Sequence, residues 1–166
     1  MLILVRIAGA DYIADVGFGG LLLTAPLRLV AGVEQKTTLE PHRLTALDAG
    51  FLMEARIAGE WQALYTFDLA EAQPADYEVS NWYLCNHPQS LFVAGILAAR
   101  TAADRRYALR YTRFAIHHAN GETERRFITR VDEYRSILEE TFGIRLPGAA
   151  HLDAKIAQMI AANPPG

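Results

Sequence analysis

Short hydrophobic runs separated by turns that contain glycine fill the first part of this chain. Leu2 to Ile7 and Tyr12 to Val16 flank Ala8-Gly9-Ala10-Asp11, a pattern typical of a β-hairpin. Three further runs with the same character predict a meander: Arg43 to Leu47, Phe51 to Ile57 and Glu60 to Phe67. Because neighbouring strands joined by short turns pair antiparallel, this part of the chain is restricted to antiparallel sheets.

The middle of the chain adds one helix and further strands. Pro74 to His87 is predicted to be a short helix that opens at Pro74 and ends before Pro88. Leu91 to Ala98 is an apolar run whose length fits a strand or a short helix, and a strand is favoured. Tyr107 to His118 and Glu122 to Thr129 flank Asn120-Gly121, a strong hairpin signal.

Beyond this hairpin the hydrophobic period becomes helical. Apolar residues at Val131, Tyr134, Leu138 and Phe142 predict a helix, with Thr129 or Asp132 available to cap its start and Gly143 to end it. A last helix is expected from Asp153 to Ala162, before Asn163-Pro164-Pro165. The sequence therefore predicts an α+β fold rather than a doubly wound sheet.

Composition excludes several classes of protein. Hydrophobic residues make up 51% and charged residues 21%, as in globular domains, and the net charge of −3 argues against a basic nucleic-acid surface. No apolar run approaches the ~20 residues of a transmembrane helix. The N-terminal apolar run is too short for a signal peptide. A single cysteine, Cys85, suits the reducing cytoplasm.

The most unusual carboxylate is Asp15, at the end of the second predicted strand. Alternation places Asp15 on the same face as Ile13, so Asp15 is buried if Ile13 faces the core. A buried carboxylate needs partners. It either ties down the following turn through backbone N–H groups, or orients an imidazole through its Nδ1–H and stabilises the imidazolium.

The turn after Asp15, Gly17-Phe18-Gly19-Gly20, is not a phosphate-binding loop, because it lacks the required glycine spacing and the Lys-Ser/Thr pair. Glycines around one aromatic residue let the backbone turn sharply and present Phe18 to a ligand. The alternative is a β-bulge with Phe18 in the core.

The other reactive side chains give weaker signals. Cys85 is two residues from His87, but triad partners normally come from distant segments, so a packed thiol is expected. The histidines at 42, 117, 118 and 151 do not share ligand spacing with a cysteine or carboxylate cluster, so no metal site is expected.

Seven motifs occur in order over residues 1–146: Asp15-Val-Gly-Phe-Gly-Gly20, Leu23-Thr-Ala-Pro-Leu-Arg-Leu29, Trp61-Gln-Ala-Leu-Tyr-Thr-Phe67, Asp76-Tyr-Glu78, Asn81-Trp-Tyr83, His87-Pro-x-Ser90-x-Phe92 and Phe142-Gly-Ile144. Together they resemble the arylamine N-acetyltransferase family. The resemblance implies transfer of an acetyl group from acetyl-CoA to an arylamine or arylhydrazine, a reaction of xenobiotic metabolism, through a Cys-His-Asp triad. It implies that Asp15 is the triad aspartate, that Gly17, Phe18 and Gly19 shape the acceptor pocket, and that Phe92 lies near coenzyme A.

The resemblance also implies the fold. It predicts a cysteine-protease-like arrangement, with an incomplete antiparallel β-barrel over residues 1–73, an interdomain segment over 74–90 and a C-terminal α/β lid over 91–166. The family's Arg-Gly-Gly-x-Cys motif is absent from these residues, and the family histidine would fall just before Met1. The chain therefore resembles a C-terminal part without the N-terminal helical bundle, and is expected to be inactive alone.

Two further expectations follow from this comparison. Apolar residues near Leu2 to Val5 and Leu21 to Leu23 should be exposed, and should favour self-association or binding of an N-terminal half. The alternatives are a non-catalytic module that binds coenzyme A or a partner, and one half of a split enzyme.

Overall fold

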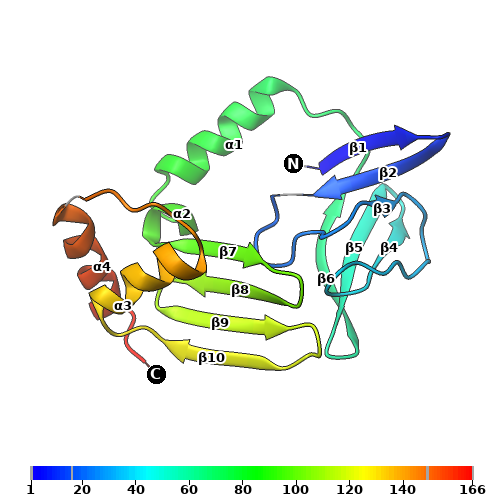
Figure 1. Ribbon diagram of the computed structural model, residues 1–166. Helices are drawn as coiled ribbons and strands as arrows, with labels where there is room; N and C mark the ends of the chain where they lie inside the picture. The colour runs from blue at the N-terminus through cyan, green and yellow to red at the C-terminus, as the bar shows by residue number, and fades with distance from the viewer. Residues whose placement is uncertain (1, 16, 149, 166) are drawn as a thin grey trace. The chain divides into compact units, whose positions relative to one another are not determined.

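The structure is a computed structural model that describes residues 2–15, 17–148 and 150–165. Its elements follow in the order β1 (Leu2–Ile7), β2 (Ala10–Asp15), β3 (Leu27–Arg28), β4 (His42–Leu47), β5 (Gly50–Ile57), β6 (Glu60–Phe67), α1 (Pro74–Asn86), α2 (Leu91–Ala94), β7 (Leu97–Thr101), β8 (Arg105–Arg110), β9 (Arg113–His118), β10 (Thr123–Phe127), α3 (Val131–Ser136), the π-helical η1 (Ile137–Thr141) and α4 (Ala150–Ala162) (Figure 1). The predicted α+β class is confirmed. Val16, which closes the second predicted strand, lies outside the described residues.

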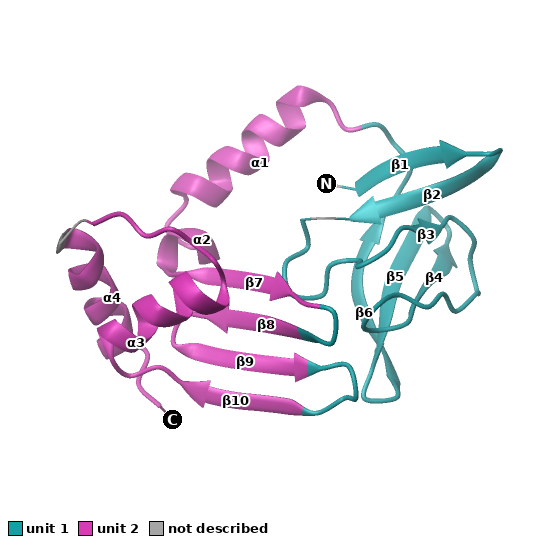
Figure 2. Cartoon of the chain, in the orientation of Figure 1, with its two compact units in different colours: residues 1–71, 103–105, 118–122 teal, residues 72–102, 106–117, 123–166 magenta. Residues whose placement is uncertain are grey.

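The chain divides into two compact units (Figure 2). The first comprises residues 1–71, 103–105 and 118–122, and the second comprises residues 72–102, 106–117 and 123–166. Strands dominate the first unit, whereas the second holds a four-stranded sheet and all of the helices. Each unit has its own cluster of buried apolar side chains.

The first unit contains two three-stranded antiparallel sheets, in the orders β1-β2-β3 and β4-β5-β6. The two-residue turns Ala8-Gly9 and Ala58-Gly59 have positive φ at both positions, with values of 49° and 80° in the first and 50° and 88° in the second. Paired positive φ angles match the right-handed twist of a hairpin. These turns join β1 to β2 and β5 to β6, so the hairpins predicted at these two positions are confirmed.

The β-barrel that the resemblance implies, expected to be incomplete, is not closed in the described residues. Closure needs an uninterrupted ring of hydrogen-bonded strands. β3 is only two residues long, and isolated bridges such as Ala31 with Leu44 stand where continuous pairing would be needed. The strands of both sheets and the segment between β2 and β3 instead contribute to one buried apolar cluster, namely Ile13, Leu23, Leu27, Leu44 and Met53.

In the second unit, α3, η1 and α4 pack on the antiparallel sheet β10-β9-β8-β7. Their shared core consists of Leu109, Phe114, Ile128, Tyr134, Ile137, Leu138, Phe142 and Ile156. Tyr134 is fully buried, and its hydroxyl donates a hydrogen bond of 2.9 Å to the carbonyl oxygen of Tyr111. That bond satisfies the one polar group that Tyr134 brings into the core.

The predicted helix from Val131 to Phe142 forms, with two differences. It changes to a π-helical turn over η1, where the Phe142 N–H donates to the Ile137 carbonyl. Neither Thr129 nor Asp132 caps its start, because the N-cap position is Arg130 and the Asp132 carboxylate pairs with the Arg130 side chain. Gly143 ends the helix with a φ of 71°, as expected.

The predicted strand from Leu91 to Ala98 is wrong in its first half. Residues Leu91–Ala94 form α2, which the Ser90 side chain caps by accepting a hydrogen bond from the Phe92 N–H at 3.3 Å. A strand begins only at Leu97. Short apolar runs do not distinguish a strand from a helix, and here the capping serine favours the helix.

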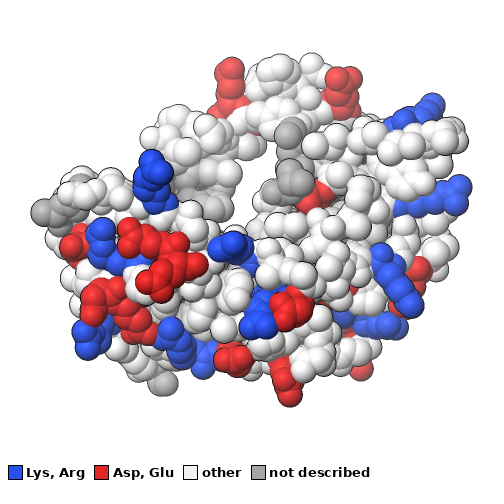
Figure 3. Space-filling model, in the orientation of Figure 1, with Lys and Arg blue, Asp and Glu red and all other residues white. Residues whose placement is uncertain are grey.

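Charges of both signs are interspersed on the face of the molecule shown in Figure 3. Around α3 three ion pairs join neighbouring side chains: Arg130 with Asp132, Arg126 with Glu133 and Arg135 with Asp153. In the described part of the chain, no helix has the length and apolar character needed to span a membrane.

Candidate active site

Asp15 is the last residue of β2 and is 4% exposed, while Ile13 two residues earlier is 2% exposed. The expectation that both side chains face inward is confirmed. Asp15 Oδ1 accepts a hydrogen bond from the Gly17 N–H at 2.9 Å, and Oδ2 accepts one from the Tyr65 hydroxyl at 2.7 Å. Two donors therefore hold the carboxylate in one orientation inside the first unit.

Tyr65, on β6, is the site residue that sequence reasoning did not single out. Burial, reinforced by the hydrogen bond to the Asp15 carboxylate, raises the pKa of Tyr65 far above its ordinary value. Its hydroxyl is therefore a permanent donor to Asp15. The signal that could have identified Tyr65 is its place on the half-buried strand β6. A tyrosine hydroxyl that points inward there requires a hydrogen-bond partner.

The glycine turn places an aromatic ring beside this pair. The Phe18 ring centroid lies 4.6 Å from that of Tyr65, with an angle of 54° between the ring planes, and Phe18 is 41% exposed. A bulge with Phe18 in the core is therefore excluded. Gly19 has a φ of 84°, and the position that a Cβ atom would occupy has no heavy atom within 4 Å. Gly17 contributes its N–H to Asp15.

Phe92 belongs to the second unit. It lies on the short helix α2, where its side chain is 61% exposed. The buried Ser90 hydroxyl fixes the start of this helix, because it donates a 2.6 Å hydrogen bond to the Leu84 carbonyl and accepts from the Phe92 N–H. The phenyl ring is thus presented to solvent from an anchored turn.

In the part of the chain that the structure describes, the other candidate side chains form no reactive cluster. Cys85 is exposed on α1, so the expectation of a packed thiol is wrong, and its Sγ lies 3.6 Å from Asn81 Oδ1. The His87 ring stacks on Tyr83 at a centroid distance of 4.5 Å. Among the described residues, no three His, Cys, Asp or Glu side chains are grouped as metal ligands.

Residues 1–151 match the protein family described as N-acetyltransferase. The arylamine N-acetyltransferase of Mycolicibacterium smegmatis is 40% identical over 160 residues, which cover 94% of this chain. This chain belongs to the arylamine N-acetyltransferase family. An arylamine N-acetyltransferase from Escherichia coli K12 is 36% identical over 152 residues, or 90% of the chain.

Solved structures of this arylamine N-acetyltransferase family share the fold. The enzyme from M. tuberculosis superposes with a TM-score of 0.86 at 37% identity and covers 95% of the chain. The Mycobacterium marinum enzyme in complex with CoA gives a TM-score of 0.84 at 36% identity and covers 96%. The chain spans little more than half of these relatives, 58% of the M. smegmatis protein and 59% of each of the two structures.

Proposed function

We propose that this chain supplies the aspartate of a Cys-His-Asp site that transfers acetyl from acetyl-CoA to an arylamine or arylhydrazine. The observation that carries the proposal is the buried Asp15 carboxylate, held by Gly17 and Tyr65 next to the exposed Phe18 ring. A carboxylate that orients an imidazole must itself be fixed, and these contacts fix it. Membership of the arylamine N-acetyltransferase family supplies the reaction class.

In this reaction a cysteine thiolate attacks the thioester carbonyl of acetyl-CoA, and coenzyme A leaves as the thiol after taking up a proton. The acetyl group then passes from the cysteine sulfur to the amine nitrogen, which loses a proton as the amide forms. A histidine carries both protons, and Asp15 holds its Nδ1–H and stabilises the imidazolium. Cytoplasmic conditions keep such a thiol reduced.

The cysteine and the histidine of this site come from outside the 166 residues. No Arg-Gly-Gly-x-Cys motif occurs in the sequence, and its one cysteine, Cys85, is exposed on α1 with Asn81 as its neighbour. We therefore expect the isolated polypeptide to transfer no acetyl group above background. A triad that lacks its nucleophile and its base loses several orders of magnitude in rate.

Substrate binding is assigned to the exposed aromatic residues. Phe18 and Gly17 line the acceptor pocket, Gly19 gives the bound thioester room, and Phe92 contacts coenzyme A. The open space at Gly19 and the exposure of both rings support this assignment. The matching structure with CoA bound supports acetyl-CoA as the donor. No metal takes part in the proposed reaction.

The division into a sheet region over 1–73, a connecting segment over 74–90 and a lid over 91–166 is retained as part of the proposal.

The partner we propose is a polypeptide equivalent to the part of the M. smegmatis relative that this chain does not cover. Two exposed apolar surfaces favour it. β1 exposes Ile3, Leu4, Val5 and Ile7, and α1 has no buried residue. Surfaces of this kind mark protein contacts in soluble proteins.

A complementation assay tests the proposal. The purified chain is mixed with acetyl-CoA and an arylamine, alone and with the missing segment of the M. smegmatis relative. We expect background turnover alone and measurable turnover in the mixture, which Asp15→Asn abolishes and the exposed control Asp48→Asn leaves unchanged. Turnover by the chain alone, or equal turnover with Asp15→Asn, would contradict the proposal.

The second candidate is a module that binds coenzyme A without catalysis, which the likeness to the CoA complex favours. Calorimetric titration with coenzyme A distinguishes it. Coenzyme A binding by the chain, combined with no turnover in the complementation assay, supports the binding module. Restored turnover supports one half of a split enzyme.

A further inference from the structure

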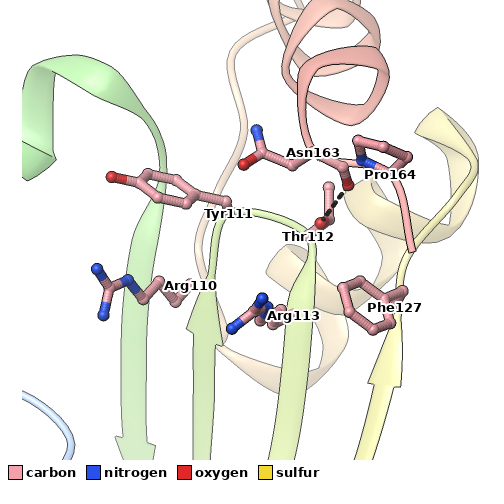
Figure 4. Close-up of a pocket in the computed structure, with 7 residues that line it drawn as sticks. All are labelled: Arg110, Tyr111, Thr112, Arg113, Phe127, Asn163 and Pro164. Carbon is pink, nitrogen blue, oxygen red and sulfur yellow. Dashed lines mark hydrogen bonds between the residues drawn. The ribbon is translucent and has the colours of Figure 1, made fainter. Parts of the chain in front are cut away.

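A cavity at one end of the four-stranded sheet lies wholly within the second unit (Figure 4). Its volume is about 320 Å³. Its walls come from the β8–β9 turn, the end of β10 and the residues that follow α4. This volume is at the small end of the range for ligand pockets, so it suits a single-ring compound better than a nucleotide cofactor.

Two guanidinium groups and a phenyl ring form one row along this cavity. Arg110 and Arg113 flank a two-residue turn, which sets them opposite each other on neighbouring strands β8 and β9. Arg113 is in turn the register partner of Phe127 on β10. In Figure 4, Arg113 lies between Arg110 and Phe127. Side chains at paired positions share one face of a sheet, so all three face the same side.

No carboxylate among the described residues compensates these two positive charges. Within the described part of the chain, neither Arg110 nor Arg113 forms an ion pair, and no acidic residue lines the cavity. Like charges at directly opposed positions destabilise a sheet. A bound anion would remove this repulsion.

Each of the two guanidinium groups lies close to an aromatic ring. The Arg113 guanidinium carbon lies 5.7 Å from the Phe127 ring centroid, and that of Arg110 lies 5.9 Å from the Tyr111 ring centroid. Such contacts restrict long side chains and leave their N–H donors available. The Phe127 ring also gives the cavity an apolar wall.

The turn between the two arginines is fixed in an uncommon conformation. Tyr111 has a φ of 54°, which a non-glycine residue rarely adopts. Its N–H donates to the Ile96 carbonyl at 2.9 Å, and its own carbonyl accepts from Tyr134 at 2.9 Å. Backbone strain that surrounding contacts maintain is common at binding sites.

The opposite wall is also anchored. The buried Thr112 hydroxyl donates to the Asn163 carbonyl at 2.9 Å, and the Asn163 amide donates to the Met159 carbonyl at 2.9 Å. These bonds tie the end of α4 to the β8–β9 turn. The cavity is therefore preorganised on both sides.

We infer that this cavity is a binding site for a small aromatic carboxylate, whose charge the two arginines neutralise and whose ring lies against Phe127. The site is separate from the acetyl-transfer proposal, since it uses none of the residues assigned there. Its test therefore succeeds or fails independently of that function.

The probe is benzoate, titrated into the 166-residue chain and followed by calorimetry and by amide chemical shifts. We expect saturable binding with shifts at residues 110–113 and 127, and weaker binding as salt rises. Arg113→Gln should weaken binding about tenfold or more, because it removes a charged hydrogen bond. Arg110→Gln provides a second variant with the same expected loss. Arg145→Gln, an exposed arginine outside the cavity, should leave binding unchanged.

Two further ligands separate charge from shape. Benzamide has the ring without the charge, and inorganic phosphate has charge without a ring, so both should bind more weakly than benzoate. Equal binding of benzamide would show that the arginines do not contribute to binding. Equal binding of phosphate would show that the aromatic wall of the cavity does not contribute. Either result, or no benzoate binding up to its solubility limit, overturns the inference.

Discussion

At the scale of single residues, the pKa of Glu54, a buried acid on β5, depends on its neighbour Arg43. Glu54 is 8% exposed and accepts hydrogen bonds from Arg43 at 2.8 and 2.9 Å and from Thr45 at 2.6 Å. The Arg43 guanidinium in turn lies 4.3 Å from the Trp61 ring centroid. The hydrogen bonds from Arg43 and then Thr45 hold the pKa of Glu54 below its ordinary value of 4.5.

This depressed pKa predicts how stability depends on pH. A carboxylate with a lower pKa in the folded state stabilises the fold above its unfolded pKa, and that contribution is lost as pH falls from about 4.5 through the folded pKa. Glu54→Gln should lower the free energy of unfolding at pH 7 by about 1–3 kcal/mol. Denaturant titrations should show the difference between the two proteins shrinking below pH 4.5. A difference that is constant with pH would contradict the prediction.

The Tyr65 hydroxyl allows a second test at this scale. Tyr65→Phe leaves one oxygen of the buried Asp15 carboxylate without its donor, so the free energy of unfolding should fall by about 1–3 kcal/mol. Tyr12→Phe is the matched control, since the Tyr12 hydroxyl has no partner in the described residues. Denaturant midpoints measure both. Equal effects of the two changes would show that the bond to Asp15 is unimportant.

Of the hydrogen-bonded pair Asp15 and Tyr65, the sequence predicted only the burial of Asp15. Alternation with Ile13 predicted the buried Asp15, because both residues lie on one strand. It could not supply Tyr65, which is 50 positions away in the chain and meets Asp15 only through tertiary packing. Local patterns show which side chains turn inward, whereas long-range packing decides which of them meet.

At the scale of elements, the junction between α2 and β7 depends on a close approach. A Cβ atom on Gly95 would lie 2.1 Å from the nearest atom of the Tyr111 ring. Gly95 itself has an extended backbone that any residue can adopt. Glycine is therefore required for space. The sequence shows an apolar run from Leu91 to Ala98, and such a run by itself predicts one strand. It does not show that the Tyr111 ring packs against Gly95 within that run.

Gly95→Ala should consequently be destabilising. Overpacking of this kind typically costs about 1–3 kcal/mol, because the ring or the backbone must move. The control is Gly148→Ala, where a Cβ atom would meet no atom within 4 Å. Thermal unfolding of the two variants gives the comparison. Adding Tyr111→Ala to Gly95→Ala should relieve the clash, and strictly additive effects would contradict it.

At the scale of the whole molecule, the exposed apolar side chains gather on particular elements. Exposure of Ile3, Leu4 and Val5 is confirmed, whereas the predicted exposure near Leu21 to Leu23 is wrong, since Leu23 is 6% exposed in the first core. After the glycine turn, Leu21 and Leu22 are half-buried and Leu23 returns to the interior. Hydropathy alone cannot tell a core residue from an interface residue, because both are apolar.

The β1 surface predicts self-association of the isolated chain. β1 is an edge strand of its sheet, and exposed apolar edges pair with other chains. Light scattering should give a mass above that of the 18.4 kDa monomer, and Leu4→Lys should reduce it. Leu69→Lys, at an equally exposed leucine outside the strands, should have little effect. A clean monomer for the unmodified chain would contradict the prediction.

The exposure of α1 has a consequence for its dynamics. A helix of 13 residues with no buried side chain has little tertiary packing to sustain it, and isolated helices of about 12–15 residues are marginal in water. Its backbone amides should therefore exchange with deuterium nearly as fast as those of an unfolded peptide. Slower exchange on adding another protein would show that α1 is part of the surface being covered, without any enzymatic assay.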